Sequence, residues 1–106
     1  MRRGVAWLTA CAALSSAPVP ALDAAREAEL LRLLRNDCGA CHGLTLRGGL
    51  GLPLTPPALA GKPDALLIDA ILVGRPGTPM PPWQAFLTAQ DAAWLVERMR
   101  RGGFDE

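Results

Sequence analysis

Histidine, tyrosine and cysteine are scarce in this sequence, and each shortage limits what the chain can do. The 106 residues include one histidine, three cysteines, no tyrosine and only five aromatic side chains. A structural zinc site takes four protein ligands, usually cysteine and histidine, so the whole chain has ligands for at most one such site. So few aromatic residues leave a thin core, and small domains of this kind need a cofactor or a cross-link for stability.

The chain also lacks an excess of charge and a long apolar segment. Its formal net charge is +1 at pH 7. A near-neutral chain gives no reason to expect nucleic acid as a partner. No stretch approaches the roughly 18 apolar residues of a membrane-spanning helix. We therefore predict neither nucleic-acid binding nor a membrane span in the mature protein.

The beginning of the chain has the pattern of an export signal. A short basic start precedes the apolar run Val5 to Leu14, and Ala21 closes a small-residue stretch of the kind that signal peptidase cleaves. We predict a signal peptide over residues 1–21, a mature domain over residues 22–106 and a periplasmic location. After cleavage, nine basic residues remain against ten acidic ones.

Cys11 allows a second interpretation of this segment. Leu8 to Cys11 resembles the cleavage box of bacterial lipoproteins, which would anchor the protein through a lipid at Cys11. That cut would leave an apolar run of only six residues, shorter than signal peptides normally have. We therefore favour removal of Cys11 with the signal peptide over lipid anchoring.

Two of the three cysteines and the only histidine lie within five consecutive residues, Cys38 to His42. Cys38 and Cys41 are three positions apart, so within one turn both sulfurs lie on the same side of the backbone. The spacing Cys-x-x-Cys-His is typical of covalent haem c attachment, with thioethers at the cysteines and the histidine on the iron. A haem would also supply the apolar surface that the thin core lacks.

Three other interpretations fit parts of this motif: a disulfide, a zinc site and a thioredoxin-like redox pair. The mature chain offers two cysteines and one histidine but no second cluster for zinc. A thioredoxin-like pair follows a strand and begins a helix, whereas this motif is predicted to follow a helix and precede a glycine-rich loop. A haem-free dithiol oxidoreductase remains the alternative.

Met80 is the predicted second axial ligand of the iron. The absence of a second histidine excludes two-histidine ligation. Met99 falls on the apolar stripe of a predicted helix, whereas Met80 stands between Pro79 and Pro81, which restrict its backbone. His/Met ligation leaves no open position for a substrate and suits electron transfer. We therefore predict an electron carrier rather than an enzyme, with a haem ligand sensor as a further alternative.

Hydrophobic periodicity predicts an all-α domain of about three helices joined by two loops rich in proline and glycine. The segment Gly43 to Pro63 is predicted to be loop without helix, and Phe104 to lie at a frayed end. The second helix is apolar nearly all round and is expected to be covered on more than one side. The predicted helices run from the N-cap Asp23 to about Asp37, from Pro63 to Val73, and from a Thr88–Asp91 capping box to Gly102.

Further residues are candidates to orient the haem. The carbonyl of Leu52 or Pro53 is expected to accept a hydrogen bond from the ring N–H of His42. Candidates to bind the haem propionates are Arg47, Arg75, Trp83 and Gln84. A solvated surface charge is the alternative for the arginines, and core packing is the alternative for the tryptophan.

With these motifs, the chain resembles a small class I cytochrome c. "CGACHGLTLRGGLG", "LTPPALAGKP" and "GRPGTPMPPW" are similar to the small periplasmic NirC-type cytochromes associated with cytochrome cd1 nitrite reductase. The resemblance covers roughly Arg35 to Arg101. It implies the class I cytochrome c fold and one haem c, with thioethers at Cys38 and Cys41 and axial ligands His42 and Met80.

The same resemblance implies a role in denitrification. One possibility is electron donation to cytochrome cd1 nitrite reductase, and the other is a redox role with the haem d1 maturation proteins. Five leucines around the glycines could form an apolar docking patch at the haem edge or cover the haem. They are Leu44, Leu46, Leu50, Leu52 and Leu54.

Overall fold

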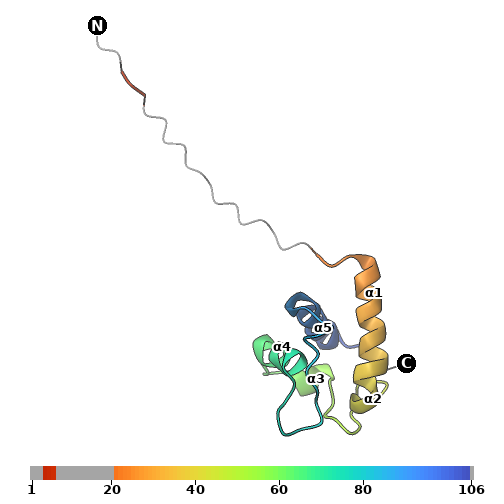
Figure 1. The fold of residues 1–106 in the computed structure, drawn as a ribbon. Helices are drawn as coiled ribbons and strands as arrows, with labels where there is room; N and C mark the ends of the chain where they lie inside the picture. The colour runs from red at the N-terminus through yellow and green to blue at the C-terminus, as the bar shows by residue number, and fades with distance from the viewer. Residues whose placement is uncertain (1–3, 7–20, 106) are drawn as a thin grey trace.

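The described part of the chain is helical, and three of its helices pack against the last one (Figure 1). The computed structural model describes residues 4–6 and 21–105. The helices are α1 (Ala24–Leu33), α2 (Gly39–His42), α3 (Pro56–Leu59), α4 (Asp64–Leu72) and α5 (Ala89–Arg101), with a π-helical segment η1 (Leu34–Cys38) between α1 and α2. No strand occurs among the described residues, which confirms the predicted all-α class.

The predicted export signal falls largely on residues that the structure does not describe. Cys11 and most of the segment 1–21 lie outside the described residues. Signal cleavage and lipid anchoring therefore stay predictions. Within the described residues, no helix has the length and apolar character needed to cross a bilayer.

One continuous helical segment leads from α1 through η1 into α2. Asp23 caps its start, as predicted, because its side chain accepts a hydrogen bond from the backbone N–H of Arg26 at 2.7 Å. The predicted end near Asp37 is wrong. Gly39 keeps helical dihedral angles (φ −61°, ψ −28°), and the helix stops only at Gly43, where φ is 92°. The haem-attachment motif therefore lies on the helix itself, beside a π-turn of the kind often found at functional sites.

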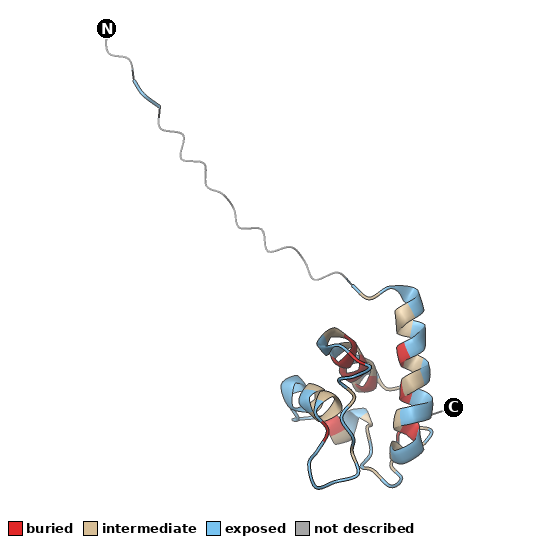
Figure 2. Ribbon diagram, viewed as in Figure 1, coloured by how far each residue is buried: buried red, intermediate tan, exposed pale blue. Residues whose placement is uncertain are grey.

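Helix α5 supplies the centre of the core (Figure 2). Its start is the predicted capping box, in which Thr88 and Asp91 exchange side-chain to backbone hydrogen bonds. The apolar stripe is buried as predicted and contacts Leu30 and Leu34 of the α1–η1 segment. The stripe consists of Ala92, Leu95, Val96 and Met99.

A buried carboxylate joins α5 to α1. Asp91 is only 2% exposed, and Arg26 of α1 donates to both of its oxygens, at 2.6 Å from Nη2 and 3.2 Å from Nε. The backbone N–H of Thr88 donates to the same carboxylate at 2.9 Å. The Arg26 hydrogen bond lowers the pKa of Asp91 below its ordinary value. One side chain thus caps α5 and fixes it against α1.

Helix α3 was not predicted, whereas α4 agrees with the predicted helix from Pro63 to Val73, which are its two cap residues. Helix α3 lies inside the segment 43–63 that was predicted to be loop, because Pro56 and Pro57 occupy its first positions, where proline is tolerated. Helix α4 runs over Asp64–Leu72, with Pro63 at its N-cap. It packs on α5, yet none of its residues is fully buried and Leu66 is 56% exposed. The described polypeptide therefore covers α4 on one side only.

The end of the described chain is packed rather than frayed. Phe104 is only 7% exposed, which makes the prediction of a frayed end wrong. The guanidinium of Arg98 lies 4.3 Å from the centre of the Phe104 ring, and that of Arg35 lies 5.9 Å from it. These cation–π contacts hold the segment against α5 and η1.

Replacing Asp91 by Asn should weaken the junction in a pH-dependent way. Because the folded pKa is lowered, the ion pair stabilises the protein above the ordinary carboxyl pKa of about 3.9 and is lost as the pH falls through the folded value. We expect Asp91→Asn to lower the free energy of unfolding by about 2 kcal/mol at neutral pH. The difference from the unmodified protein should shrink in acid, as measured by denaturant titration at several pH values.

The matched control is Asp69→Asn, which removes an exposed carboxylate from α4. It should leave the unfolding curve nearly unchanged. If the free energy of unfolding of Asp91→Asn were lower than that of the unmodified protein by the same amount at neutral and acid pH, the assigned role of the ion pair would be contradicted.

Candidate functional site

A cavity of about 810 Å³ opens between the loop that follows α2 and the loop that follows α4. Figure 1 shows both loops at the lower end of the domain. The cavity brings Cys41 and His42 together with Met80, although the two loops are far apart in the sequence. Its volume lies within the range of about 300–1,000 Å³ that is usual for ligand sites. The remaining lining residues are Gly48, Gly49, Leu50, Gly51, Leu52, Pro53, Ala70, Arg75, Thr78, Pro79 and Pro81.

The ring of His42 is held by a backbone carbonyl. Its Nδ1 lies 2.6 Å from the carbonyl oxygen of Leu52. A carbonyl can only accept, so the ring donates from Nδ1 and keeps the lone pair of Nε2 free for a metal. From the sequence, the carbonyl of either Leu52 or Pro53 was expected to accept this hydrogen bond. In the structure the carbonyl of Leu52 accepts it.

Close backbone approach explains a glycine beside this ring. A Cβ atom at Gly51 would lie 2.8 Å from Cε1 and Nδ1 of His42. The backbone N–H of Gly51 also donates to the carbonyl of Cys41 at 2.7 Å, and that of Gly48 donates to the carbonyl of His42 at 2.8 Å. The loop therefore folds back onto the end of α2, and the absence of a side chain at Gly51 lets the imidazole lie flush against it.

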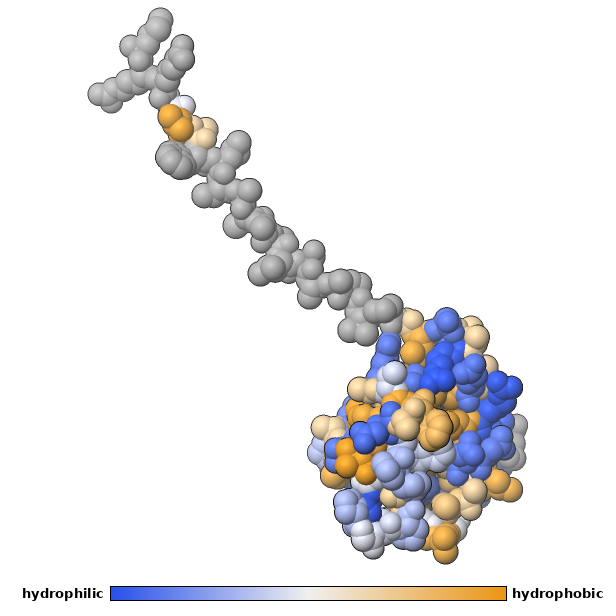
Figure 3. All heavy atoms as spheres, in the orientation of Figure 1, coloured by the Kyte–Doolittle hydropathy of each residue, from blue (hydrophilic) through white to orange (hydrophobic). Residues whose placement is uncertain are grey.

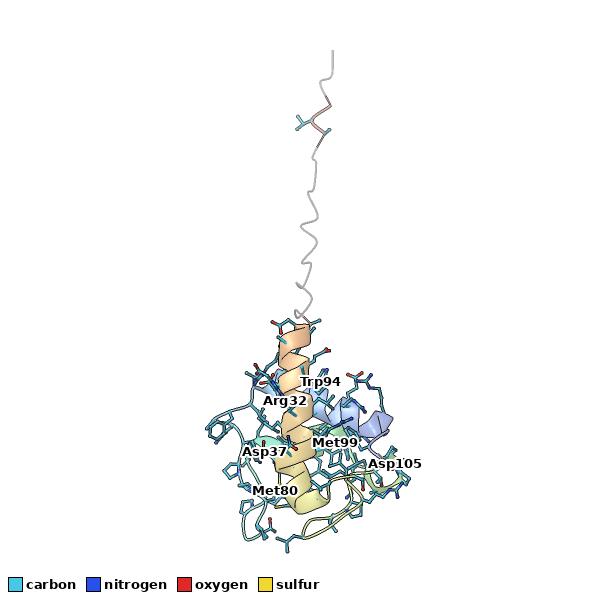
Figure 4. The ribbon with its side chains drawn as sticks, turned by 90° about the vertical axis from the view of Figure 1, so that its right-hand side faces the viewer. Arg32, Asp37, Met80, Trp94, Met99 and Asp105 are labelled. Atoms are coloured by element: carbon cyan, nitrogen blue, oxygen red, sulfur yellow. The ribbon has the colours of Figure 1, made fainter. Side chains whose placement is uncertain are left out.

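Met80 lies on a closed turn. The backbone N–H of Arg75 donates to the Met80 carbonyl at 3.2 Å, and the Met80 N–H donates to the Thr78 hydroxyl at 3.3 Å. Gly74 precedes the turn with φ 74°, and a Cβ atom there would lie 2.7 Å from the Met80 oxygen. In Figure 4, Met80 lies near the lower end of the domain, whereas Met99 lies higher, between the helices. Met99 is buried in the core, as expected.

The two cysteines of the motif differ in environment. Cys38 is half-buried against the core, and Cys41 is exposed at the cavity. Burial, with a smaller contribution from Asp37, raises the pKa of the Cys38 thiol to about 11. The nucleophilic thiol of a dithiol oxidoreductase has a lowered pKa, which Cys38 does not have. Among the described residues, no group of three His, Cys, Asp or Glu side chains is placed to hold a metal ion.

The four candidates for propionate binding have different positions. Arg75 lines the cavity. Arg47 does not line it; its guanidinium pairs with Asp105 at 2.6 Å, and Figure 4 shows Asp105 well away from Met80. Trp83 is half-buried against the core, with its ring edge-on to Phe86, and lies outside the lining. Gln84 is exposed, and its backbone N–H donates to the end of α4.

The five leucines of the predicted docking patch divide into two groups. Leu46 is 1% exposed and Leu54 is half-buried, so both belong to the core rather than to a surface patch. Leu46 has a left-handed φ of 59°, and its backbone donates to the Gly43 carbonyl and accepts from the Leu54 N–H, each at 2.8 Å. The exposed members are Leu44, Leu50 and Leu52, with Leu50 at 83%.

Comparison with known proteins agrees with this site. A family model described as "Cytochrome C oxidase, cbb3-type, subunit III" matches residues 25–98. Cytochrome c55X of Pseudomonas aeruginosa is 52% identical over 101 residues, which span 91% of this chain and 84% of the relative. The solved structure of the c-type cytochrome NirC is 57% identical, with a TM-score of 0.76, and the match covers 78% of this chain and 98% of NirC. The chain belongs to the NirC-type cytochromes c.

Two further relatives extend the comparison. Cytochrome c55X of Paracoccus denitrificans is 55% identical over 75 residues, covering 71% of this chain and 73% of the relative. A solved structure entitled dihydro-heme d1 dehydrogenase NirN in complex with DHE is 34% identical, with a TM-score of 0.64. That match covers 69% of this chain but only 16% of NirN, so the likeness is to a small part of that protein.

As a NirC-type cytochrome c, the protein carries covalently bound haem c and functions in electron transfer. The donor set of the cavity fits this group. It offers an imidazole with a free Nε2, a thioether held on a rigid turn, and a cysteine at the wall, within a lining that is mostly apolar. Imidazole and thioether are the axial ligands found in electron-transfer cytochromes c.

Adding a methyl group at Gly51 should displace the His42 ring. Gly51→Ala places its Cβ too close to the imidazole, so the ring must lose its hydrogen bond to Leu52 or the loop must shift. We expect the free energy of unfolding of the holoprotein to fall by about 2 kcal/mol and the fraction of haem-loaded protein to decrease. Thermal unfolding and the visible absorption spectrum measure the two effects.

Gly103→Ala provides the control for steric contact, because nothing lies within 4 Å of a Cβ at that position, although its φ of 88°, unlike that of Gly51, is unfavourable for alanine. The control should keep the spectrum of the unmodified protein. An unaltered spectrum and stability in Gly51→Ala would refute the tight packing of ring and loop.

Proposed function

We propose that this protein is a periplasmic single-haem cytochrome that donates electrons to cytochrome cd1 nitrite reductase. In this proposal Cys38 and Cys41 form the thioether links, and His42 and Met80 are the axial ligands. The observation that carries it is the arrangement of His42, fixed by Leu52, with Met80 across the same cavity. The relationship to NirC supports the denitrification setting.

The residues of the cavity prepare it for rapid electron exchange. When bound, haem iron supplies a one-electron couple. The Leu52 carbonyl keeps the His42 ring in one tautomer, and the closed turn around Met80 holds the thioether with little freedom to move. Ligands that are already positioned need little rearrangement when the charge of the centre changes. A thioether ligand also raises the reduction potential.

The rim of the cavity suits a brief encounter with another protein. Leu44, Leu50 and Leu52 are exposed on the loop that borders it. Figure 3 shows hydrophobic atoms exposed at the lower end of the domain, where this loop lies. Electron-transfer complexes are among the smallest specific interfaces, so a small apolar area suits one. These residues support docking at the edge of the cavity.

A second candidate function is a redox role in haem d1 maturation. The observation that favours this role is the 34% identity to a part of NirN, which is described as a dihydro-heme d1 dehydrogenase. A segment similar in sequence to this chain is therefore part of that protein. A separate cytochrome of the same type could exchange electrons with such an enzyme.

Stopped-flow absorbance distinguishes the two roles. Reduced, periplasm-expressed protein is mixed with oxidised cytochrome cd1 nitrite reductase while the haem c bands are followed. We expect rapid reoxidation. A protein with a sound His/Met spectrum that stays reduced after mixing would reject the donor role and leave haem d1 maturation. Leu50→Ser should slow the reaction several-fold if the rim is the docking surface, whereas Leu66→Ser, on exposed α4, serves as its control.

Carbon monoxide binding tests the assignment of Met80. In the reduced holoprotein Met80 should block the sixth position, so carbon monoxide should bind readily only to Met80→Ala. Met99→Leu keeps a core side chain of similar volume and should behave like the unmodified protein. Equal binding to unmodified protein and Met80→Ala would show that Met80 is not a ligand, and would favour a sensor.

A further inference from the structure

We propose that Arg75 binds a haem propionate and thereby raises the reduction potential of the protein. This inference rests on the proposed function, since it requires haem in the cavity between His42 and Met80. It assigns a positioning residue for the cofactor rather than another iron ligand.

Among the described residues that line the cavity, Arg75 alone carries a permanent charge. The other lining residues are apolar or glycine, apart from Thr78, Cys41 and His42. No side-chain partner within the described residues holds the Arg75 guanidinium, whereas four other arginines donate to carboxylates or carbonyls elsewhere. Those four are Arg26, Arg47, Arg98 and Arg100.

The chemistry of the cofactor supplies the missing partner. Haem c carries two propionate carboxylates, and a carboxylate in a mostly apolar cavity is costly unless it is paired. A guanidinium matches a carboxylate with two parallel N–H···O hydrogen bonds. Arg75 therefore provides the matching charge on the cavity wall. A positive charge in the same cavity would disfavour the oxidised state of a bound haem, which carries the greater positive charge.

Backbone hydrogen bonds link the same residue to the axial ligand. Besides its N–H bond to the Met80 carbonyl, Arg75 accepts hydrogen bonds from Thr78, at 3.0 Å from the backbone nitrogen and 2.6 Å from the hydroxyl. Arg75 and Met80 thus lie at the two ends of one closed turn. A propionate bound by Arg75 and an iron bound by Met80 would be held by the same short segment.

The test compares midpoint potentials of complete holoproteins by spectroelectrochemical titration. Arg75→Gln removes the charge, Arg75→Lys keeps it, and Arg47→Gln removes the arginine that was an equal candidate from the sequence but pairs with Asp105. At fixed ambient potential we expect Arg75→Gln to lower the ratio of reduced to oxidised protein about tenfold, which is about 59 mV for a one-electron couple. Arg75→Lys should lower the midpoint potential by less than half as much as Arg75→Gln. Arg47→Gln should have the midpoint potential of the unmodified protein.

Resonance Raman spectra report on the propionates directly, because a distant charge would not shift their bending modes. The propionate bending modes should shift in Arg75→Gln and stay in place in Arg47→Gln. Arg75→Met is a parallel variant in case glutamine disturbs the turn. Unchanged potential and propionate modes, in a variant that keeps the methionine-ligation band, would overturn the assignment. Loss of the methionine-ligation band in both Arg75→Gln and Arg75→Met would also overturn the assignment, because Arg75 would then act only by holding the turn that carries Met80.

These outcomes are distinct from a failure of the proposed function. If the unmodified protein carries no covalent haem or lacks methionine ligation, the axial ligand assignment falls and the Arg75 assignment falls with it. If the unmodified protein has a normal His/Met spectrum and only the Arg75 comparison fails, the electron-transfer function stands without the propionate contact.

Discussion

The ion pair between Arg26 and Asp91 fixes the relation between the two parts of the chain that build the cavity. Asp91 is buried and caps α5, and Arg26 lies on α1. Helix α1 continues through η1 into α2, which carries Cys41 and His42, while α5 begins just after the loop that carries Met80. A second hydrogen bond between the same helices, from the Trp94 indole to Glu27 at 3.2 Å, supports this junction. The start of α5, next to the Met80 loop, is thus tied to the start of the helical segment that ends at His42.

Features that depend on short sequence distances could be predicted well. The capping box at Thr88 and Asp91, the buried stripe of α5 and the placement of Met80 in a loop all follow from residues a few positions apart. The end of the first helix was misplaced because Gly39 is a poor helix former that nevertheless keeps helical dihedral angles, and the helix continues until Gly43. Helix α3 was missed because its two prolines suggest a loop but are equally suited to a first helical turn.

Features that depend on contacts between distant residues could not be predicted. Arg47 and Arg75 had equal standing in the sequence, and only the folded chain shows that Asp105 pairs with Arg47 while Arg75 lines the cavity. Leu52 and Pro53 offered adjacent carbonyls, and the choice between them depends on how the loop folds back onto α2. The burial of Phe104 likewise depends on arginines from two different helical segments.

The covalent haem compensates for the small core of this domain. Helix α4 has no fully buried residue, although it is the most apolar helix, and Ala70 on one side of it lines the cavity. The described polypeptide alone therefore leaves apolar surface of α4 without cover. Each Å² of apolar surface removed from water contributes roughly 25 cal/mol, so a large apolar cofactor seated in this cavity adds the burial that a short chain lacks. Because the haem is covalently linked, it cannot dissociate, and the stability that its burial adds is not lost. This suits a domain whose own side chains leave part of its apolar surface uncovered.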